Sequence, residues 1–297
     1  MRSIEVMCFG GGVDSTAMLA AHLHRDAAST FFGVSLNDLE AALPLFDAII
    51  FADTGAEMPH TYTNVEASRQ LLQQRSNIPF ITAQHATHTL PSWLEKNGNL
   101  PLLPGGPHVC SLKFKGQVME RAVRQEFGAD IQVNWSIGIE ANESSRSKRF
   151  TKPKDTSFTY AYPLMKLNID RDKADGFIKH VGWPVEVAKS SCYFCPFMTE
   201  KEILDLQLRY PHLWEECQQI EERFVAASEA KHKTWLKAGK PVIQLKTGNT
   251  RAPVGMWKKD SYQEGGRLFA KSINGRRLSI PEWTERMKPF HATKNVA

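Results

Sequence analysis

The sequence predicts an α/β protein whose mainly parallel sheet is covered by helices on both faces. Three observations predict this class. Short apolar segments alternate with longer helical segments in the first half of the chain, three glycines follow the first apolar segment, and Asp53-Thr54-Gly55 follows the second. Strands that alternate with helices form crossover units and therefore parallel sheets. Such sheets bind ligands at the carboxyl ends of their strands, where both turns are expected to lie.

The predicted elements follow in order along the chain. Apolar segments predict four strands, at residues 4–9, 48–52, 79–83 and 131–139. Helical patterns predict helices at residues 15–25, 57–74 and 115–127, and a long charged helix at 211–233. Residues 97–115 are rich in proline and glycine and residues 140–158 are polar, so both segments are expected to be irregular.

The composition is that of a globular chain of 297 residues, with 42% hydrophobic and 23% charged residues. The first residues lack the apolar core of a signal peptide. No apolar run approaches the roughly 18 residues that a membrane span needs. We therefore expect a cytoplasmic protein with no membrane partner. Five cysteines in such a chain favour metal or redox chemistry over a disulfide framework.

The net charge of +5 is unevenly distributed. Residues 231–297 contain 15 Lys and Arg against 4 Asp and Glu, which leaves a charge of −6 on the rest of the chain. Aromatic residues are interleaved with these cations: Trp235, Trp257, Tyr262, Phe269, Trp283 and Phe290. This pattern suits a nucleic-acid partner, with phosphate contacts and base stacking. The alternative is a solvated basic face whose aromatic residues turn into a core.

The glycine turn between the first strand and helix is suited to phosphate binding. Glycines let phosphate oxygens approach backbone N–H groups, and the helix start adds its positive dipole end. The nucleoside-triphosphatase loop GxxxxGK[ST] does not fit, because no lysine follows. The dinucleotide loop GxGxxG does not fit either, because Ser15 stands at its last glycine. The alternative is a tight turn without a ligand.

The stretch Gly-Gly-Val-Asp-Ser-Thr, residues 11–16, resembles the PP-loop SGGxDS of the adenine nucleotide alpha hydrolases, or ATP pyrophosphatases. Further segments resemble the phosphoadenosine phosphosulfate reductase-like branch of that superfamily, in its cysteine-containing sulfurtransferase form. These segments are residues 51–66, 110–115, 137–149, 162–184 and 190–198. The resemblance covers about residues 4–215. Gly10 departs from it, where the family usually has serine, and so does Glu140, where arginine is expected.

The resemblance implies a Rossmann-like, HUP-type domain at residues 1–215, followed by a helical and basic module at 216–297. It implies ATP as ligand, with pyrophosphate held by Gly10, Gly11, Gly12, Asp14, Ser15 and Thr16. Asp14 is expected to orient Mg²⁺ or the attacking group, and Asp53 to bind ribose or adenine. The alternative role of Asp53 is to cap its turn. Lys113, Glu143 and Arg146 are expected to serve pyrophosphate, substrate or adenylate; the last two lie in a segment that could equally be solvated.

Three cysteines form the candidate metal site. Cys192 and Cys195 make a CxxC pair before Pro196, and Cys110 lies in the irregular segment 97–115. The first reading is a [4Fe–4S] cluster with one open iron, because clusters normally take four thiolates and this site offers three. The resemblance supports this reading. The second is zinc, with His108 or Cys217 as fourth ligand. The third is a redox dithiol or buried thiols.

These observations lead to one functional hypothesis and two alternatives. The hypothesis is an ATP-dependent adenylating sulfurtransferase whose acceptor is nucleic acid and whose sulfur comes from a donor protein. The first alternative is a reductase of adenylyl sulfate or phosphoadenylyl sulfate. The second is a zinc-containing nucleic-acid-binding protein without catalysis.

Overall fold

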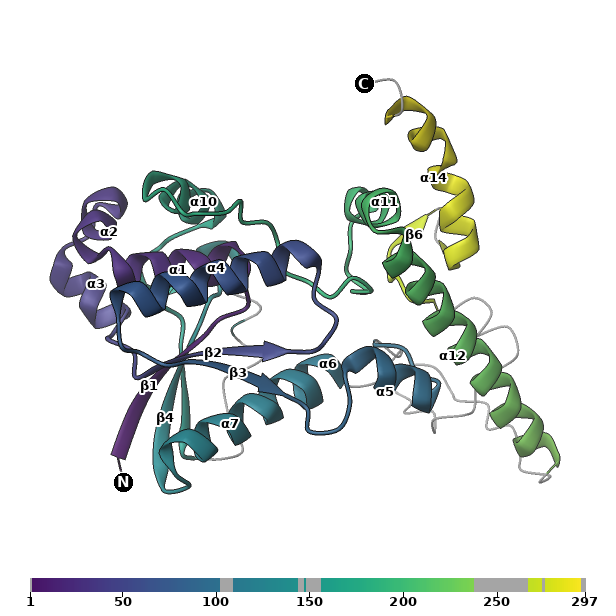
Figure 1. Cartoon of the computed structure of the whole chain (residues 1–297), viewed down its shortest axis with the longest axis horizontal. Helices are drawn as coiled ribbons and strands as arrows, with labels where there is room; N and C mark the ends of the chain where they lie inside the picture. Colours follow the sequence, from purple (N-terminus) through teal and green to yellow (C-terminus); the bar gives the residue numbers. More distant parts are fainter. Residues whose placement is uncertain are drawn as a thin grey trace. The chain divides into compact units, whose positions relative to one another are not determined.

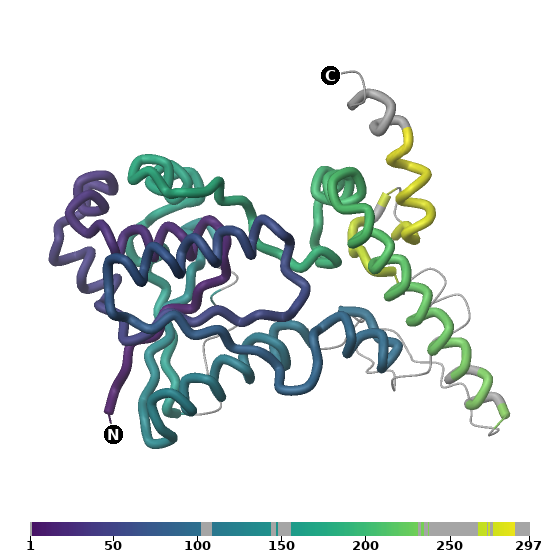
Figure 2. Tube along the Cα trace, in the orientation of Figure 1, coloured from purple at the N-terminus to yellow at the C-terminus, as the bar shows by residue number. Residues whose placement is uncertain are grey.

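The computed structural model describes residues 2–101, 109–143, 147, 156–237, 267–273 and 276–294. They group into two compact units, each made of several separate segments of the chain. Figure 2 traces the chain and is coloured by residue number. The first unit comprises Met1–Asp53, Glu57–Gln84 and Lys115–Ser191. The second comprises Thr54–Ala56, His85–Phe114 and Cys192–Ala297.

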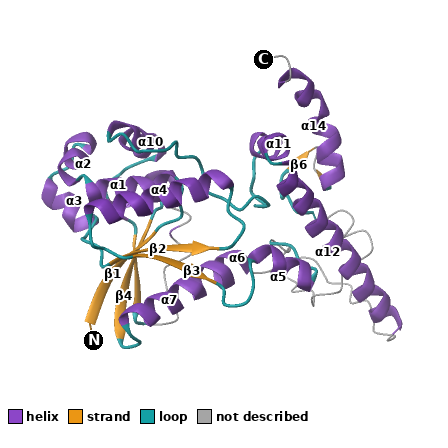
Figure 3. Ribbon diagram, viewed as in Figure 1, coloured by secondary structure: helices purple, strands orange, loops and turns teal. Residues whose placement is uncertain are grey.

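A five-stranded, all-parallel sheet forms the centre of the first unit and confirms the predicted fold class. Its order is β3-β2-β1-β4-β5. Figure 3 shows the strands in orange. The strands are β1 (Arg2–Cys8), β2 (Ala48–Asp53), β3 (Phe80–Gln84), β4 (Ile131–Ile137) and β5 (Phe158–Ala161). The first four match the predicted segments to within two residues at each end. The fifth was not predicted, because four residues next to a polar segment carry too little pattern.

Helices cover both faces of this sheet (Figure 1). One face carries α1 (Val13–Leu23), α2 (Arg25–Phe32), α3 (Leu36–Ala42), α4 (Pro59–Arg75) and α10 (Arg171–His180). The other face carries α7 (Gln117–Phe127). Met18 and Phe177 are fully buried in the first layer, and Val123 is fully buried in the second. Since strands buried on both faces need apolar side chains on both, β2 is apolar at every position before Asp53.

The predicted helix at 15–25 is wrong at its end. The backbone leaves the helical region at His24, where α1 ends and α2 begins. The residues between α9 (Pro163–Lys166) and α10 form a turn in which Asn168 has φ +54°. A 3-10 turn, η2 (Ala141–Glu143), lies in the segment expected to be irregular.

The second unit is mainly helical in its described part. Its elements are α5 (Leu90–Asn97), α6 (Val109–Ser111), α11 (Glu200–Arg209), α12 (Pro211–Lys237), β6 (Ser272–Ile273), β7 (Arg276–Arg277) and α14 (Ile280–Lys294). The α12 helix confirms the long helix predicted at 211–233. The expected irregular segment 97–115 is wrong at its end, because α6 continues through the π-helical turn η1 (Leu112–Gly116) into α7.

Two aromatic residues of the basic region lie in the core of the second unit. Phe269 and Trp283 are fully buried, and the Phe269 ring stacks on Trp214 at 6.1 Å between centroids. For these two residues the core alternative therefore holds. Trp257 and Tyr262 lie outside the described residues. Among the helices that the structure describes, none has the length and apolar character of a membrane span.

Candidate functional site

The glycine loop lies at the carboxyl end of the central strand. It joins β1 to α1, and Gly12 is the N-cap residue of α1. The β1 strand pairs with β2 on one side and with β4 on the other, so the strand order reverses its direction there. Crevices that bind ligands in open α/β sheets lie at such a switch point. The predicted loop and the predicted edge of the sheet therefore coincide.

Two of the three glycines are required by their immediate neighbours. Gly11 has φ +72°, and a Cβ there would lie 2.9 Å from Thr61 Cγ2. A Cβ on Gly12 would lie 2.7 Å from Ser190 Oγ and 3.1 Å from Ser190 N. At each of these two positions a Cβ would lie closer to its neighbours than side chains normally approach. The loop therefore depends on glycine for its backbone path as well as for access to its N–H groups.

Asn64 on α4 fixes the conformation of the glycine loop by hydrogen bonds. Its Nδ2 donates to Gly11 O at 2.9 Å and to Thr16 Oγ1 at 2.8 Å, while its Oδ1 accepts from Trp183 Nε1 at 2.9 Å. Asn64 is 1% exposed. Because a buried side chain with all these bonds has little freedom, Asn64 holds the loop in one conformation. Sequence reasoning missed this residue.

The hydroxyl groups of the loop are engaged inside it. Ser15 Oγ donates to Gly12 O at 3.1 Å and accepts from Gly10 N at 3.1 Å. Thr16 is fully buried, and its hydroxyl accepts the bond from Asn64. In this structure both side chains therefore shape the loop. The N–H groups at the start of α1 are the groups best suited to meet phosphate oxygens.

Asp14 forms an ion pair with Arg171, the first residue of α10. Arg171 Nη2 lies 3.0 Å from Asp14 Oδ2. The Asp14 side chain is 8% exposed, whereas the Arg171 side chain is 41% exposed. The pair therefore presents its cationic partner to solvent beside the glycine loop, with the carboxylate behind it. Sequence reasoning had assigned no role to Arg171.

Asp53 is held at the end of β2 by two side chains. Tyr62 Oη donates to Asp53 Oδ1 at 2.7 Å, and Gln84 Nε2 donates to Asp53 Oδ2 at 2.8 Å. Burial, followed by the Asp53 carboxylate, raises the pKa of Tyr62 above its usual range, so the phenol stays a proton donor. This geometry orients the carboxylate at the sheet edge where a ribose or adenine group was expected.

The remaining predicted side chains are distributed over both units. Glu143 ends η2 in the first unit, and Arg146 lies outside the described residues. The buried Glu140 accepts from Asn142 N at 2.8 Å. Lys113 belongs to the second unit, where its ammonium lies 4.8 Å from the centroid of the Trp93 ring.

The CxxC pair forms a tight turn in the second unit. Cys195 N donates to Cys192 O at 3.0 Å, and Tyr193 N donates to Ala56 O at 2.9 Å. Cys192 is buried with its Sγ 3.5 Å from Thr54 Oγ1, and Cys195 is partly exposed. The Cys217 thiol donates to Tyr193 O at 3.7 Å, and burial raises its pKa well above the usual range. Cys217 is therefore suited to support the turn.

The donor set fits a metal only in part. Two thiols on one turn suit a metal or cluster, and Cys110 belongs to the same unit. However, the described residues contain no group of three or more His, Cys, Asp or Glu side chains that could hold a metal ion. His108, the other proposed zinc ligand, lies outside the described residues.

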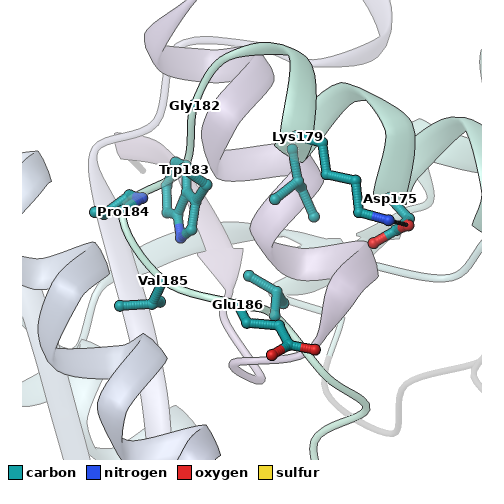
Figure 4. Close-up of a pocket in the computed structure, with 9 residues that line it drawn as sticks. Asp175, Lys179, Gly182, Trp183, Pro184, Val185 and Glu186 are labelled. Atoms are coloured by element: carbon teal, nitrogen blue, oxygen red, sulfur yellow. Dashed lines mark hydrogen bonds and ion pairs between the residues drawn. The ribbon is translucent and has the colours of Figure 1, made fainter.

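A separate cavity of about 440 Å³ lies beyond the end of α10 (Figure 4). It is lined by residues of α10 and of the segment that follows: Asp175, Ile178, Lys179, Gly182, Trp183, Pro184, Val185, Glu186 and Val187. Its main polar pair, Lys179 and Asp175, is already joined by an ion pair. Trp183 lines the cavity and bonds Asn64, so the packing of this segment is connected to the glycine loop.

Gly10 differs from its two neighbours and offers a test of the loop. A Cβ there would lie 3.7 Å from Ser190 Oγ and 3.9 Å from Ser15 Oγ, which are ordinary contacts. We expect Gly10→Ser to fold with a thermal midpoint within about 2 °C of the parent, because surface-like changes shift stability by under about 0.5 kcal/mol. Gly12→Ser is the matched control, and its midpoint should fall by several degrees. Equal midpoints for the two variants would contradict the loop geometry.

No protein-family model matches this chain, and the searches of curated proteins and of solved structures also found no match.

Proposed function

We propose that this protein binds ATP at the glycine loop and cleaves it between the α and β phosphates to adenylate a substrate. The observation that carries the proposal is the loop itself. A Gly-Gly-Val-Asp-Ser-Thr turn joins the central strand to α1 at the switch point of a parallel sheet, with an Asp14–Arg171 ion pair beside it. Its likeness to the PP-loop supports ATP as the ligand.

The proposed reaction needs positioning and charge neutralisation more than a covalent role for the protein. An oxygen of the substrate attacks the α-phosphorus. The bond from that phosphorus to the bridging oxygen breaks, pyrophosphate leaves with the electron pair, and AMP stays on the substrate. The first-turn N–H groups of α1 would bind the leaving pyrophosphate. Asp14 would hold Mg²⁺, since carboxylate oxygen is a preferred ligand of that ion.

A sulfur-transfer step would follow adenylation. A sulfide-level sulfur species from a donor protein attacks the activated atom, and AMP leaves. Cys192 and Cys195, with Cys110, are the residues that would hold an iron–sulfur cluster or, as the alternative, zinc. A cluster would supply a site for the sulfur species. The CxxC turn supports this part of the proposal. The proposal also requires the Cys110 thiol to bind the same cluster or metal as Cys192 and Cys195.

The nucleic-acid acceptor is proposed from the charge of the C-terminal region. Four described cations there already pair with acids: Arg267 with Glu221, Arg276 with Glu282, Arg286 with Glu200 and Lys288 with Glu285. Other cations of residues 231–297, such as Lys258 and Lys259, fall outside the described residues. These basic residues are the ones proposed to contact phosphate.

The adenylation step is tested by incubating protein purified without oxygen with Mg²⁺, ATP and a pool of transfer RNA or DNA. We expect pyrophosphate together with an equal amount of AMP, which is either still attached to the nucleic acid or released from it by water. Asp14→Asn should lower their rate at least about 100-fold, since removing a group that stabilises transition-state charge costs about that much. Asp26→Asn, an exposed acid on α2, is the control and should keep the parent rate. ADP and phosphate as products, or no turnover, would overturn the proposal.

The metal proposal is tested on the same preparation by measuring iron, acid-labile sulfide and zinc. Four irons and four sulfides per chain, lost in Cys192→Ser and Cys195→Ser, would support a cluster. Cys8→Ala is the control, because this thiol lies on β1 and its burial raises its pKa to about 12. Stoichiometric zinc without sulfide would support the zinc alternative. Absence of both would overturn the metal site.

A further inference from the structure

We propose that Arg171 is the phosphate-binding cation of the glycine loop, and that it exchanges Asp14 for phosphate oxygens when the nucleotide binds. The inference rests on the proposed function. It names the residue that replaces two cations absent from the sequence pattern: the lysine of a triphosphatase loop and the arginine expected at position 140. Residues 10–16 contain one acid and no base, and position 140 is Glu.

The charge of the loop requires a cation from elsewhere. Asp14 alone would repel the triphosphate, because both are anionic and water is partly excluded at the start of α1. The guanidinium of Arg171 neutralises Asp14 at 3.0 Å in the nucleotide-free structure. Asp14 would hold Mg²⁺ in the nucleotide complex, where the metal would supply that neutralisation and leave the guanidinium to the phosphates.

The chemistry of arginine suits this exchange. A guanidinium has five N–H donors in a planar fork that matches phosphate oxygens in pairs. The recorded bond to Asp14 uses Nη2. The Arg171 side chain is 41% exposed, so part of the guanidinium-bearing side chain is accessible from solvent.

The backbone before Arg171 is built to aim it. Asn168 has φ +54°, a left-handed conformation that costs most non-glycine residues free energy and that asparagine tolerates best. Ile169 N donates to Leu164 O at 2.8 Å, and Asp170 caps α10 by accepting from Lys173 N at 2.9 Å. These bonds fix the first residue of α10 next to the loop.

The experiment measures binding rather than turnover. Isothermal titration calorimetry with Mg²⁺–ATP and with AMP compares the parent chain with Arg171→Ala, Arg171→Lys and Arg121→Ala. We expect Arg171→Ala to weaken ATP binding about 10–100-fold, the range for loss of a charge-assisted bond. AMP binding should change less than about 3-fold, and Arg171→Lys should lie between. Arg121, an exposed cation on α7, which packs on the other face of the sheet, is the control, and Arg121→Ala should bind as the parent does.

A double variant separates contact with phosphate from neutralisation of Asp14. In an Asp14→Asn background, Arg171→Ala should still weaken ATP binding at least about 10-fold if the guanidinium contacts phosphate. No further loss in that background would overturn the inference, because Arg171 would then act only through Asp14. Equal ATP affinity of the parent and Arg171→Ala would overturn it while leaving the proposed function standing. A parent chain that binds no ATP would overturn both.

Discussion

Replacing Asn64 by leucine should lower the free energy of unfolding by about 3–5 kcal/mol and abolish nucleotide binding. Leucine has the same branched shape and the same number of side-chain heavy atoms but offers no polar atom. Gly11 O, Thr16 Oγ1 and Trp183 Nε1 would each lose the bond from Asn64 in a site that water does not reach. An unsatisfied buried polar group costs about 1–3 kcal/mol, so the three losses are large together. Urea unfolding followed by circular dichroism measures the effect.

The control for Asn64 is its neighbour on α4. Thr63 is exposed and bonds only its own helix, through Oγ1 to Pro59 O at 3.2 Å, so Thr63→Ala should change stability by less than about 0.5 kcal/mol. Hydrogen exchange adds a local measurement, because the amides at the start of α1 should lose protection in Asn64→Leu. A variant as stable as the parent would show that Asn64 does not hold the loop.

Glu221→Ala should have an effect of similar size in the second unit. The buried carboxylate accepts from Leu268 N at 3.0 Å and from Ile280 N at 3.1 Å, and Arg267 Nη1 lies 3.7 Å away. Burial raises the pKa of Glu221, while these bonds favour its charged form. Alanine would leave two buried N–H groups and one cation without this partner, so we expect a loss of about 3–5 kcal/mol.

The measurement for Glu221 is thermal unfolding together with hydrogen exchange at the amides of Leu268 and Ile280. Both amides should exchange much faster in Glu221→Ala, and Glu221→Gln should keep one of the two bonds and lie between. Glu222→Ala is the matched control, because Glu222 is exposed on the same helix and contacts Gln218. Unchanged protection at both amides would contradict the structural role of Glu221.

The sequence was sufficient for four of the five strands and for the glycine loop, because apolar runs and glycines report on local structure. The α5 helix was not among the predicted elements, although both of its ends carry signals. The α5 helix begins after the N-cap Thr89, has proline in its first turn and ends at Gly98 with φ +54°, all of which are readable start and stop signals. The break between α1 and α2 at His24 has no such signal, since neither glycine nor proline marks it.

The site was predictable only in its local part. Residues 10–16 are contiguous and match a motif, whereas the groups that complete the loop come from distant segments. Asn64 lies about 50 positions from its partners in the loop, and Arg171 lies 157 positions from Asp14. Neither spacing has a pattern, because contacts across a fold depend on how helices pack on a sheet. The resemblance leads one to expect arginine at position 140, where this chain has Glu. The cation beside the loop is instead Arg171, the first residue of α10.

The interleaving of the two units has a consequence for how the chain folds as it is made. The chain leaves the first unit after Asp53 and Gln84 and returns at Glu57 and Lys115. On the ribosome, residues 54–56 and 85–114 therefore emerge well before Cys192 and the segment that completes their unit. They must wait through the synthesis of β4, β5 and α10, a delay of several seconds at about 5–20 residues per second. The first unit is complete once residue 191 has emerged and can fold before the second, whereas a chain stopped at residue 191 would still display segments made to pack on residues it lacks.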